Sequence, residues 1–209
     1  PIFGIHDDHD LGKNNSDDSI KNKEIMLKMF RSFFPVDTRI GEVQLGPGNS
    51  FAIECFGMLA VFFDTRSFKN KKKDHYLGPE QLNWIKKILF QNQMPVMLIS
   101  TQQFWSYRFL AESYQGTSQV EFQQLIDYIK SLKQNIFFIS GDVHYSQLQQ
   151  VPYELLKAQT FEITSSAFFS SSARSFGKRS IEEGQIFYYG HPNFITLEQI
   201  QISDNDMSM

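Results

Sequence analysis

The chain alternates short apolar runs with longer segments in which apolar residues recur every three or four positions. Short apolar runs bounded by polar or turn-forming residues are typical of buried strands. They predict strands at 1–5, 51–55, 58–63, 96–99, 136–139, 161–164 and 194–202. The runs at 51–55 and 58–63 are separated only by Phe56-Gly57, which indicates a hairpin.

Helical periodicity predicts three helices. The first lies between 16 and 34 and is stopped by Pro35, and the second opens at Gly78 with a proline behind it. The third opens at Ser118, with Glu121 at the spacing of a capping box, and continues to 132. Glycine-rich, lysine-rich and serine-rich segments predict loops at 36–49, 69–74 and 165–175, and we expect the lysines of 69–74 to face solvent.

Strands and helices alternate along the chain, an order that favours an α/β fold with a buried sheet. Several predicted strands end in polar or titratable residues. Because ligand crevices in α/β sheets lie outside the carboxyl ends of the strands, we expect these groups to converge on one site. They are Asp7 to Asp10 after the first strand, Asp64 and Arg66 after 58–63, Thr101 to Gln103 after 96–99, and Asp142 and His144 after 136–139.

Composition narrows the class of protein. With 209 residues, 41% hydrophobic residues and 21 Phe, the chain can bury a core of its own, which excludes a disordered protein and favours a single domain. With a net charge of -3, the chain has no overall positive potential that would attract nucleic acid or an anionic membrane. The single cysteine, Cys55, excludes an intrachain disulfide, and no apolar run reaches the ~18 residues of a membrane helix. Because the chain opens on Pro1 without Met, we expect a processed protein or a fragment.

The first chemical candidate is the acidic cluster at 7–10. It combines Asp7, Asp8, His9 and Asp10, and Asn14 follows shortly after. Three carboxylates this close would repel one another unless a cation neutralised them. Oxygen and imidazole donors suit Ca²⁺, Mg²⁺, Mn²⁺, Fe or Zn²⁺. The alternative is a solvated acidic loop or helix cap, and composition alone does not separate the two.

The second candidate is Gly141-Asp142-Val143-His144, directly after a predicted buried strand. Side chains two residues apart on a strand point the same way, so Asp142 and His144 are placed to bind one metal centre or two adjacent ones. The alternative is an Asp–His pair that only satisfies the strand end. Both clusters follow apolar strands and both mix hard oxygen with imidazole, which makes the pair more specific than either cluster alone.

A series of short motifs follows in the order Ile5 to Asn14, Phe63-Asp64-Thr65-Arg66, Leu77-Gly78 with Gln81 and Trp84, Ser140 to Tyr145, Glu162 to Ser166, and Asn193-Phe194. In this order they resemble successive motifs of the PhoD-like (alkaline phosphatase D) metallophosphatases. The resemblance covers nearly the whole chain. It implies a calcineurin-like α/β/β/α sandwich with a multinuclear metal site that hydrolyses phosphate esters.

The resemblance also implies roles for individual residues. His9 would protonate the leaving oxygen or stabilise the transition state, and Asp10 would orient it. Arg66 and Gln102 are candidate substrate-binding residues, although Arg66 is equally placed to pair with Asp64 or another carboxylate. The implied metal ligands are Asp7, Asp8, Asn14, Asp142 and His144, and the metals are divalent or trivalent ions of Ca, Fe, Mn, Mg or Zn.

The sequence therefore predicts a metal-dependent phosphoric ester hydrolase, a phosphomonoesterase or phosphodiesterase that acts through a metal-activated water. The family motif expected upstream of the acidic cluster is missing, so we expect 1–209 to be one metallophosphatase domain without its N-terminal strands, and the isolated chain to be inactive. The resemblance implies a secreted or membrane-associated protein. The alternative is a non-catalytic metal-binding or interaction domain that descends from the same fold.

Overall fold

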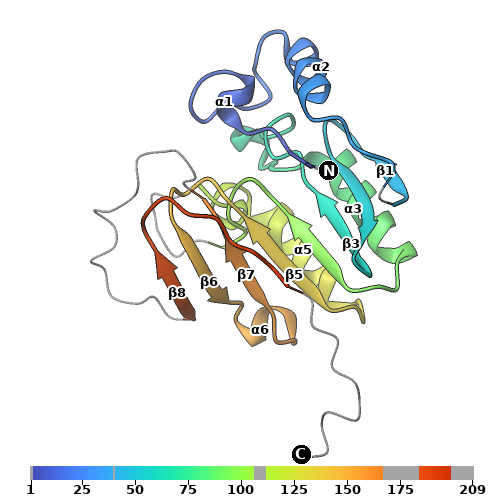
Figure 1. Cartoon of the computed structure of the whole chain (residues 1–209), viewed down its shortest axis with the longest axis vertical. Helices are drawn as coiled ribbons and strands as arrows, with labels where there is room; N and C mark the ends of the chain where they lie inside the picture. Colours follow the sequence, from blue (N-terminus) through green and yellow to red (C-terminus); the bar gives the residue numbers. More distant parts are fainter. Residues whose placement is uncertain (1, 40, 106–111, 167–183, 199–209) are drawn as a thin grey trace, which may run out of the picture.

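The computed structural model describes residues 2–39, 41–105, 112–166 and 184–198 (Figure 1). The strands of this part form one sheet in the order β1-β2-β3-β4-β5-β7-β6-β8. Their bounds are β1 Val43–Leu45, β2 Phe51–Cys55, β3 Met58–Phe62, β4 Val96–Ile99, β5 Ile136–Ser140, β6 Ser146–Gln150, β7 Phe161–Thr164 and β8 Gln185–Tyr189. The fold is therefore a mixed α/β fold.

The centre of the sheet is parallel and its two edges are antiparallel. Strands β3, β4, β5 and β7 run parallel to one another, whereas β1 and β2 join the sheet antiparallel at one edge, and β6 and β8 at the other. The predicted hairpin of β2 and β3 is confirmed, with Phe56 and Gly57 both at positive φ in its turn. The predicted strands at 96–99, 136–139 and 161–164 are confirmed as well.

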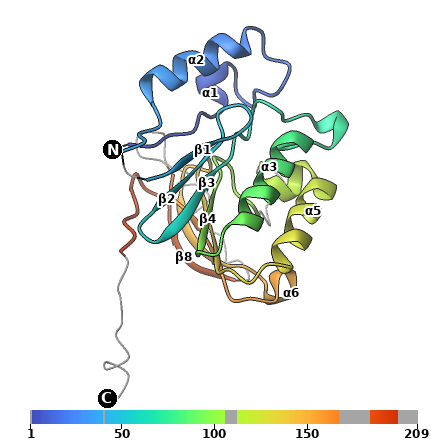
Figure 2. The ribbon, with the colours of Figure 1, turned by 90° about the vertical axis from the view of Figure 1, so that its right-hand side faces the viewer.

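Helices cover one face of the sheet and one of its ends. The bounds are α1 Asp8–Leu11, α2 Lys23–Phe33, α3 Gly78–Gln91, α4 Tyr114–Thr117, α5 Gln119–Lys130 and α6 Tyr153–Leu156, with a 3-10 turn at Lys71–Lys73. Figure 2 shows α3, α5 and α6 against the same face, while α1 and α2 stand beyond one end of the strands. None of the helices within the described ranges is both long and apolar enough to cross a membrane.

The main core lies between the sheet and α3 and α5. Alternate residues of the central strands, such as Val61, Leu98 and Phe138, are fully buried there against Leu89 and Leu125. Full burial of a large apolar side chain contributes roughly 1.5–3 kcal/mol. A smaller cluster on the opposite face packs Phe3 and Ile5 onto Phe51 and Ile53. Within the described residues there is one sheet, where the predicted sandwich has two.

The sequence prediction was wrong at both ends of the chain. Residues 2–5 form no strand, because β1 occupies the edge beside β2 and Phe3 instead packs its ring on Phe51 and Phe62, with centroids 6.0 and 6.2 Å apart. Residues 194–198 form no strand either, since β8 takes the position beside β6; the rest of the predicted strand at 194–202 lies outside the described residues. Strands β1, β6 and β8 were not predicted. In the predicted serine-rich loop, 165–166 are irregular and the remainder lies outside the described residues.

Candidate active site at the carboxyl edge of the sheet

Three parallel strands end at the same edge of the sheet. The register pairs Phe62 of β3 with Ile99 of β4, and Ile99 with Ile139 of β5, so the residues that follow these strands start from one line. Figure 1 shows α1 and α2 beyond this end. The acidic cluster of α1 is thereby brought to the residues that follow the strands.

Arg66, just after β3, joins the acidic cluster to the sheet. Its side chain is fully buried; Nε donates to Asp7 Oδ1 at 2.6 Å, and Nη1 donates to Glu112 Oε2 at 3.0 Å. Nη2 lies 3.8 Å from Asp8 Oδ2 and makes no hydrogen bond with a described residue. Burial opposes the charged guanidinium, but Asp7, Glu112 and Asp8 outweigh it and raise the pKa of Arg66. Arg66 therefore stays charged and keeps one buried donor group available.

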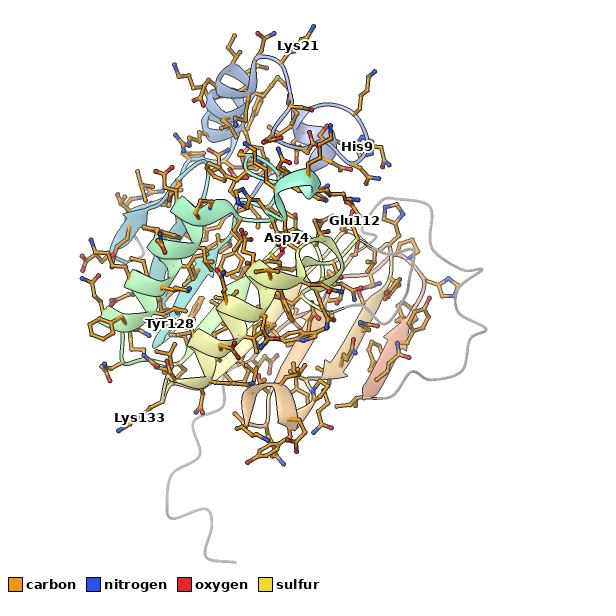
Figure 3. The ribbon with its side chains drawn as sticks, turned by 180° about the vertical axis from the view of Figure 1, so that it is seen from behind. His9, Lys21, Asp74, Glu112, Tyr128 and Lys133 are labelled. Carbon is orange, nitrogen blue, oxygen red and sulfur yellow. The ribbon has the colours of Figure 1, made fainter. Side chains whose placement is uncertain are left out.

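Lys69 and Glu112 complete this cluster, and sequence reasoning missed both. The prediction of a solvated Lys69 was wrong: the residue is 1% exposed, and its Nζ donates to Glu112 Oε1 at 2.8 Å and Gln102 Oε1 at 3.3 Å. Burial lowers the pKa of Lys69 despite the hydrogen bond to Glu112. Burial opposes ionisation of Glu112, but Lys69 and Arg66 overcome it and lower its pKa. Figure 3 shows Glu112 on the side of the sheet end that α1, the helix with His9, stands over.

Gln102 follows β4 and is fully buried in the same cluster. Its Nε2 donates to Glu112 Oε2 at 2.5 Å, while its Oε1 accepts from Lys69. With both ends of its amide used in this way, Gln102 holds Glu112 and Lys69 in place. Its predicted contact with substrate remains a prediction.

Asp142 follows β5, and its carboxylate interacts electrostatically with the charged residues of the same cluster. It is half-buried, has a positive φ of 68° and accepts no hydrogen bond from a described residue. Burial first, and then the charge of Asp7, raise the pKa of Asp142 to about 6, although Arg66 works in the opposite direction. Asp142 is therefore a carboxylate whose charge is only partly neutralised.

A buried His–Asp pair fastens the N-terminal segment to the end of β3. His6 Nε2 lies 3.1 Å from Asp64 Oδ1, and Asn49 Nδ2 donates to His6 Nδ1 at 3.1 Å. Asp64 also accepts from the N–H groups of Asn49 and Ser67, both at 2.9 Å. Burial opposes the charge on Asp64, but the adjacent His6 imidazole foremost, and then the hydrogen bond from the Asn49 N–H, lower its pKa to about 2. The side chain of Arg66 is thus left free to bind Asp7 and Glu112, and only its N–H reaches Asp64, at 3.2 Å.

The other predicted site residues lie at the rim. His9, Asp10, Asn14 and His144 are exposed. The Asp10 carboxylate accepts the Asp7 N–H at 2.8 Å, so the alternative of a helix cap accounts for this residue. Within the described ranges no hydrogen bond or ion pair joins the side chain of His9, Asn14 or His144 to the Arg66 cluster.

The predicted metal centre is not formed by the described residues alone. Among them, no group of three or more His, Cys, Asp or Glu side chains is arranged to hold a metal ion. Asp7 binds Arg66 instead, and the Asp8 carboxylate accepts the N–H groups of His9 at 2.8 Å and Asn15 at 2.6 Å. In this structure the Asp7 and Asp8 carboxylates are therefore held by donors of the chain itself. The expected set of Asp7, Asp8, Asn14, Asp142 and His144 is not brought together among the described residues, and its role in binding metal stays a prediction.

Comparison with known proteins gives a structural likeness. No protein-family model and no curated protein sequence matches the chain. The solved structure of PhoD superposes with a TM-score of 0.68, covering 88% of this chain and 44% of PhoD at 16% identity. GAP50, the anchor in the inner membrane complex of Plasmodium, gives a TM-score of 0.45 over 68% of this chain and 43% of its own, at 14% identity. The likeness to PhoD shows that the two chains share a fold, and this chain spans less than half the length of PhoD.

Proposed function

We propose that the chain carries part of the active site of a metal-dependent phosphoric ester hydrolase, within one partial domain of the metallophosphatase sandwich. The observation that carries the proposal is the buried guanidinium of Arg66 at the carboxyl edge of a PhoD-like sheet, whose Nη2 makes no hydrogen bond with a described residue. The metal dependence rests on the family resemblance, because the described residues do not complete a metal site.

Arg66 is the proposed phosphate-binding group. Asp7 and Glu112 fix the plane of the guanidinium, and Nη2, which makes no hydrogen bond with a described residue, is the donor proposed for a phosphoryl oxygen. Charge builds up on phosphoryl oxygens during transfer, so a positioned, permanently charged donor stabilises the transition state more than the ground state. The raised pKa of Arg66 keeps that donor charged at all working pH values.

His9 is the proposed acid. It is exposed on α1, at the rim of the cluster, and its backbone N–H is held by Asp8 Oδ1 at 2.8 Å. An imidazole nitrogen can carry a proton to the leaving oxygen. In this proposal Asp8, Asn14, Asp142 and His144 are the residues to test as metal ligands.

The experiment measures hydrolysis of an aryl phosphate by the chain and by the longest polypeptide that its gene encodes, with Ca²⁺, Mn²⁺ or Fe added and with chelator. We expect turnover with added metal, reduced at least about a hundredfold by Asp142→Ala or His144→Ala, as for other lost metal ligands. Lys133→Ala, a change of an exposed residue remote from this edge, should retain full turnover (Figure 3). Unchanged turnover in both Asp142→Ala and His144→Ala would contradict the proposal.

A second candidate function is a non-catalytic domain of the same fold. It is favoured by one observation: Arg66 and Lys69 already neutralise Asp7 and Glu112 without a metal. The same assay separates the two functions. Bound metal without hydrolysis, or neither metal nor hydrolysis, in the longest polypeptide favours the second candidate. Localisation is a further part of the first proposal, and fractionation of cells and medium tests the implied secretion or membrane association.

A further inference from the structure

A hollow of about 270 Å³ lies between α2 and two loops of the sheet, apart from the Arg66 cluster. Its walls come from the cationic stripe of α2 on one side, and from Gly48 and Phe68 on the other. The stripe consists of Lys23, Lys28 and Arg31. Leu27, one helical turn from Lys23, is 5% exposed and packs α2 down, which turns this stripe toward the loops.

None of the three cations at the hollow forms an ion pair with a residue that the structure describes. Lys23 Nζ donates to the carbonyl oxygen of Ser67 at 2.9 Å and lies 5.7 Å from the centre of the Phe68 ring. Arg31 Nη2 donates to the carbonyl oxygen of Gly48. Carbonyl groups orient these side chains but leave their charge in place. Lys28 forms no ion pair with any residue that the structure describes.

The acidic residues at the hollow cancel only part of this charge. Glu24 and Glu80 line it too, both are exposed, and neither is paired with Lys23, Lys28 or Arg31 within the described residues. Three cations against two carboxylates leave one net positive charge around an open volume. Like charges that face a common hollow repel one another, and an anion between them removes that repulsion.

We propose that this hollow is a second binding site, for a small anion of the phosphate type, either free phosphate or a phosphate group on a larger ligand. Phosphate oxygens accept several charge-assisted hydrogen bonds at once, as lysine and arginine side chains on two sides of a hollow require. Ser67 and Phe68 follow Arg66 directly, so the second site lies beside the 64–68 segment that also carries the candidate active site. The inference stands independently of any hydrolase activity.

The experiment titrates inorganic phosphate into the chain by calorimetry, alongside Lys28→Glu, Lys133→Glu and Arg66→Gln. Lys28→Glu and Lys133→Glu change the net charge equally, but Lys133 lies at the far end of the molecule from Lys21 and α2 (Figure 3). We expect Lys28→Glu to weaken binding at least roughly tenfold, a loss of about 1.4 kcal/mol. Lys133→Glu should leave the affinity of this site within about twofold. Arg66→Gln should do the same where circular dichroism shows that the variant is folded, because Arg66 itself does not line the hollow.

Other outcomes overturn the proposal. Equal weakening by Lys28→Glu and Lys133→Glu would show a non-specific charge effect, and loss in Arg66→Gln alone would place the phosphate in the candidate active site. No binding up to about 10 mM phosphate, a concentration at which even millimolar affinity is seen, also overturns it. Lys28→Gln, which removes one charge without adding another, repeats the test if Lys28→Glu fails to fold.

Discussion

The carboxylate of Glu121, on α5, binds the amino end of α3 at Gly78. Its Oε2 accepts the Gly78 N–H at 2.9 Å, and its Oε1 accepts the N–H groups of Tyr76 at 3.1 Å and Leu77 at 2.7 Å. The hydroxyl of Tyr114 donates to Oε1 as well, at 3.0 Å. The first N–H groups of a helix have no partner within it, and a negative charge there also suits the helix dipole. Glu121 therefore caps a helix other than its own.

Glu121→Ala is expected to lower the free energy of unfolding by roughly 2–4 kcal/mol, because it leaves buried N–H groups without an acceptor. Urea denaturation followed by circular dichroism measures the change. Asp127→Ala on the same helix is the control: its exposed carboxylate lies 3.7 Å from Lys130 and accepts a hydrogen bond from Gln123 Nε2 at 2.8 Å. Because both partners are at the surface, its loss should cost less than about 0.5 kcal/mol. Equal costs in the two variants would contradict the cap.

Arg66→Gln is expected to lower the free energy of unfolding by roughly 3–5 kcal/mol, because it leaves the carboxylates of Asp7 and Glu112 without the buried cation between them. Adding Asp7→Asn should then cost less than it does in the parent chain, since part of the uncompensated charge is already gone. A double-mutant cycle by urea denaturation measures this coupling. Additive effects of the two substitutions would show that the 2.6 Å pair has no energetic coupling.

Gly48→Ala is expected to destabilise the fold more than Gly57→Ala. Both glycines have positive φ, 63° and 70°, so both substitutions cost roughly 1 kcal/mol in backbone strain. A Cβ at Gly48 would also lie 2.2 Å from Asp64 Oδ2 and 2.9 Å from the Phe68 ring, whereas a Cβ at Gly57 meets nothing within 4 Å. Thermal unfolding of the two variants compares them directly. A smaller loss at Gly48 than at Gly57 would be inconsistent with this packing.

The strands that could be predicted are those whose own residues are apolar enough to indicate burial. The central strands are continuous apolar runs, and the turn at Phe56-Gly57 marks the hairpin. Strand β6 reads SQLQQ and carries no such pattern. Its Gln147 and Gln149 are buried because β6 pairs with β7 and β8 and because Gln147 Nε2 donates to Gln149 Oε1 at 3.0 Å. Partners from other parts of the chain decide this strand, and local pattern does not show them.

The same distinction applies to the candidate site. The expectation that polar residues after neighbouring strands converge placed Arg66 and Asp142 at one edge. Lys69 was predicted to be solvated, and this was wrong because its partner Glu112 comes from a loop that is remote in the sequence. The spacing of Ser118 and Glu121 predicted a capping box within one helix. In the structure Ser118 Oγ donates to the carbonyl of Asp74, and Glu121 caps α3. A buried charge takes whichever partner the fold supplies, so spacing along the chain does not identify it.

Glu162 on β7 is expected to make the stability of the chain depend on pH. It is fully buried and accepts the N–H groups of Phe104 at 2.7 Å and Trp105 at 3.2 Å. Burial outweighs these hydrogen bonds and raises its pKa from 4.5 to about 7. The folded chain therefore holds a proton that the unfolded chain releases between these pH values. Stability should fall as pH rises through this window, by an amount on the order of 3 kcal/mol.

Glu162→Gln removes this titration, because glutamine is neutral at every pH. Urea midpoints from pH 4.5 to 8 should decline less steeply in Glu162→Gln than in the parent, and the difference between the two curves isolates Glu162 from Asp142 and other titrating groups. The control is Glu154→Gln, whose side chain is 80% exposed and whose curve should follow the parent. Parallel curves for Glu162→Gln and the parent would mean that Glu162 has the same pKa in the folded and unfolded chains.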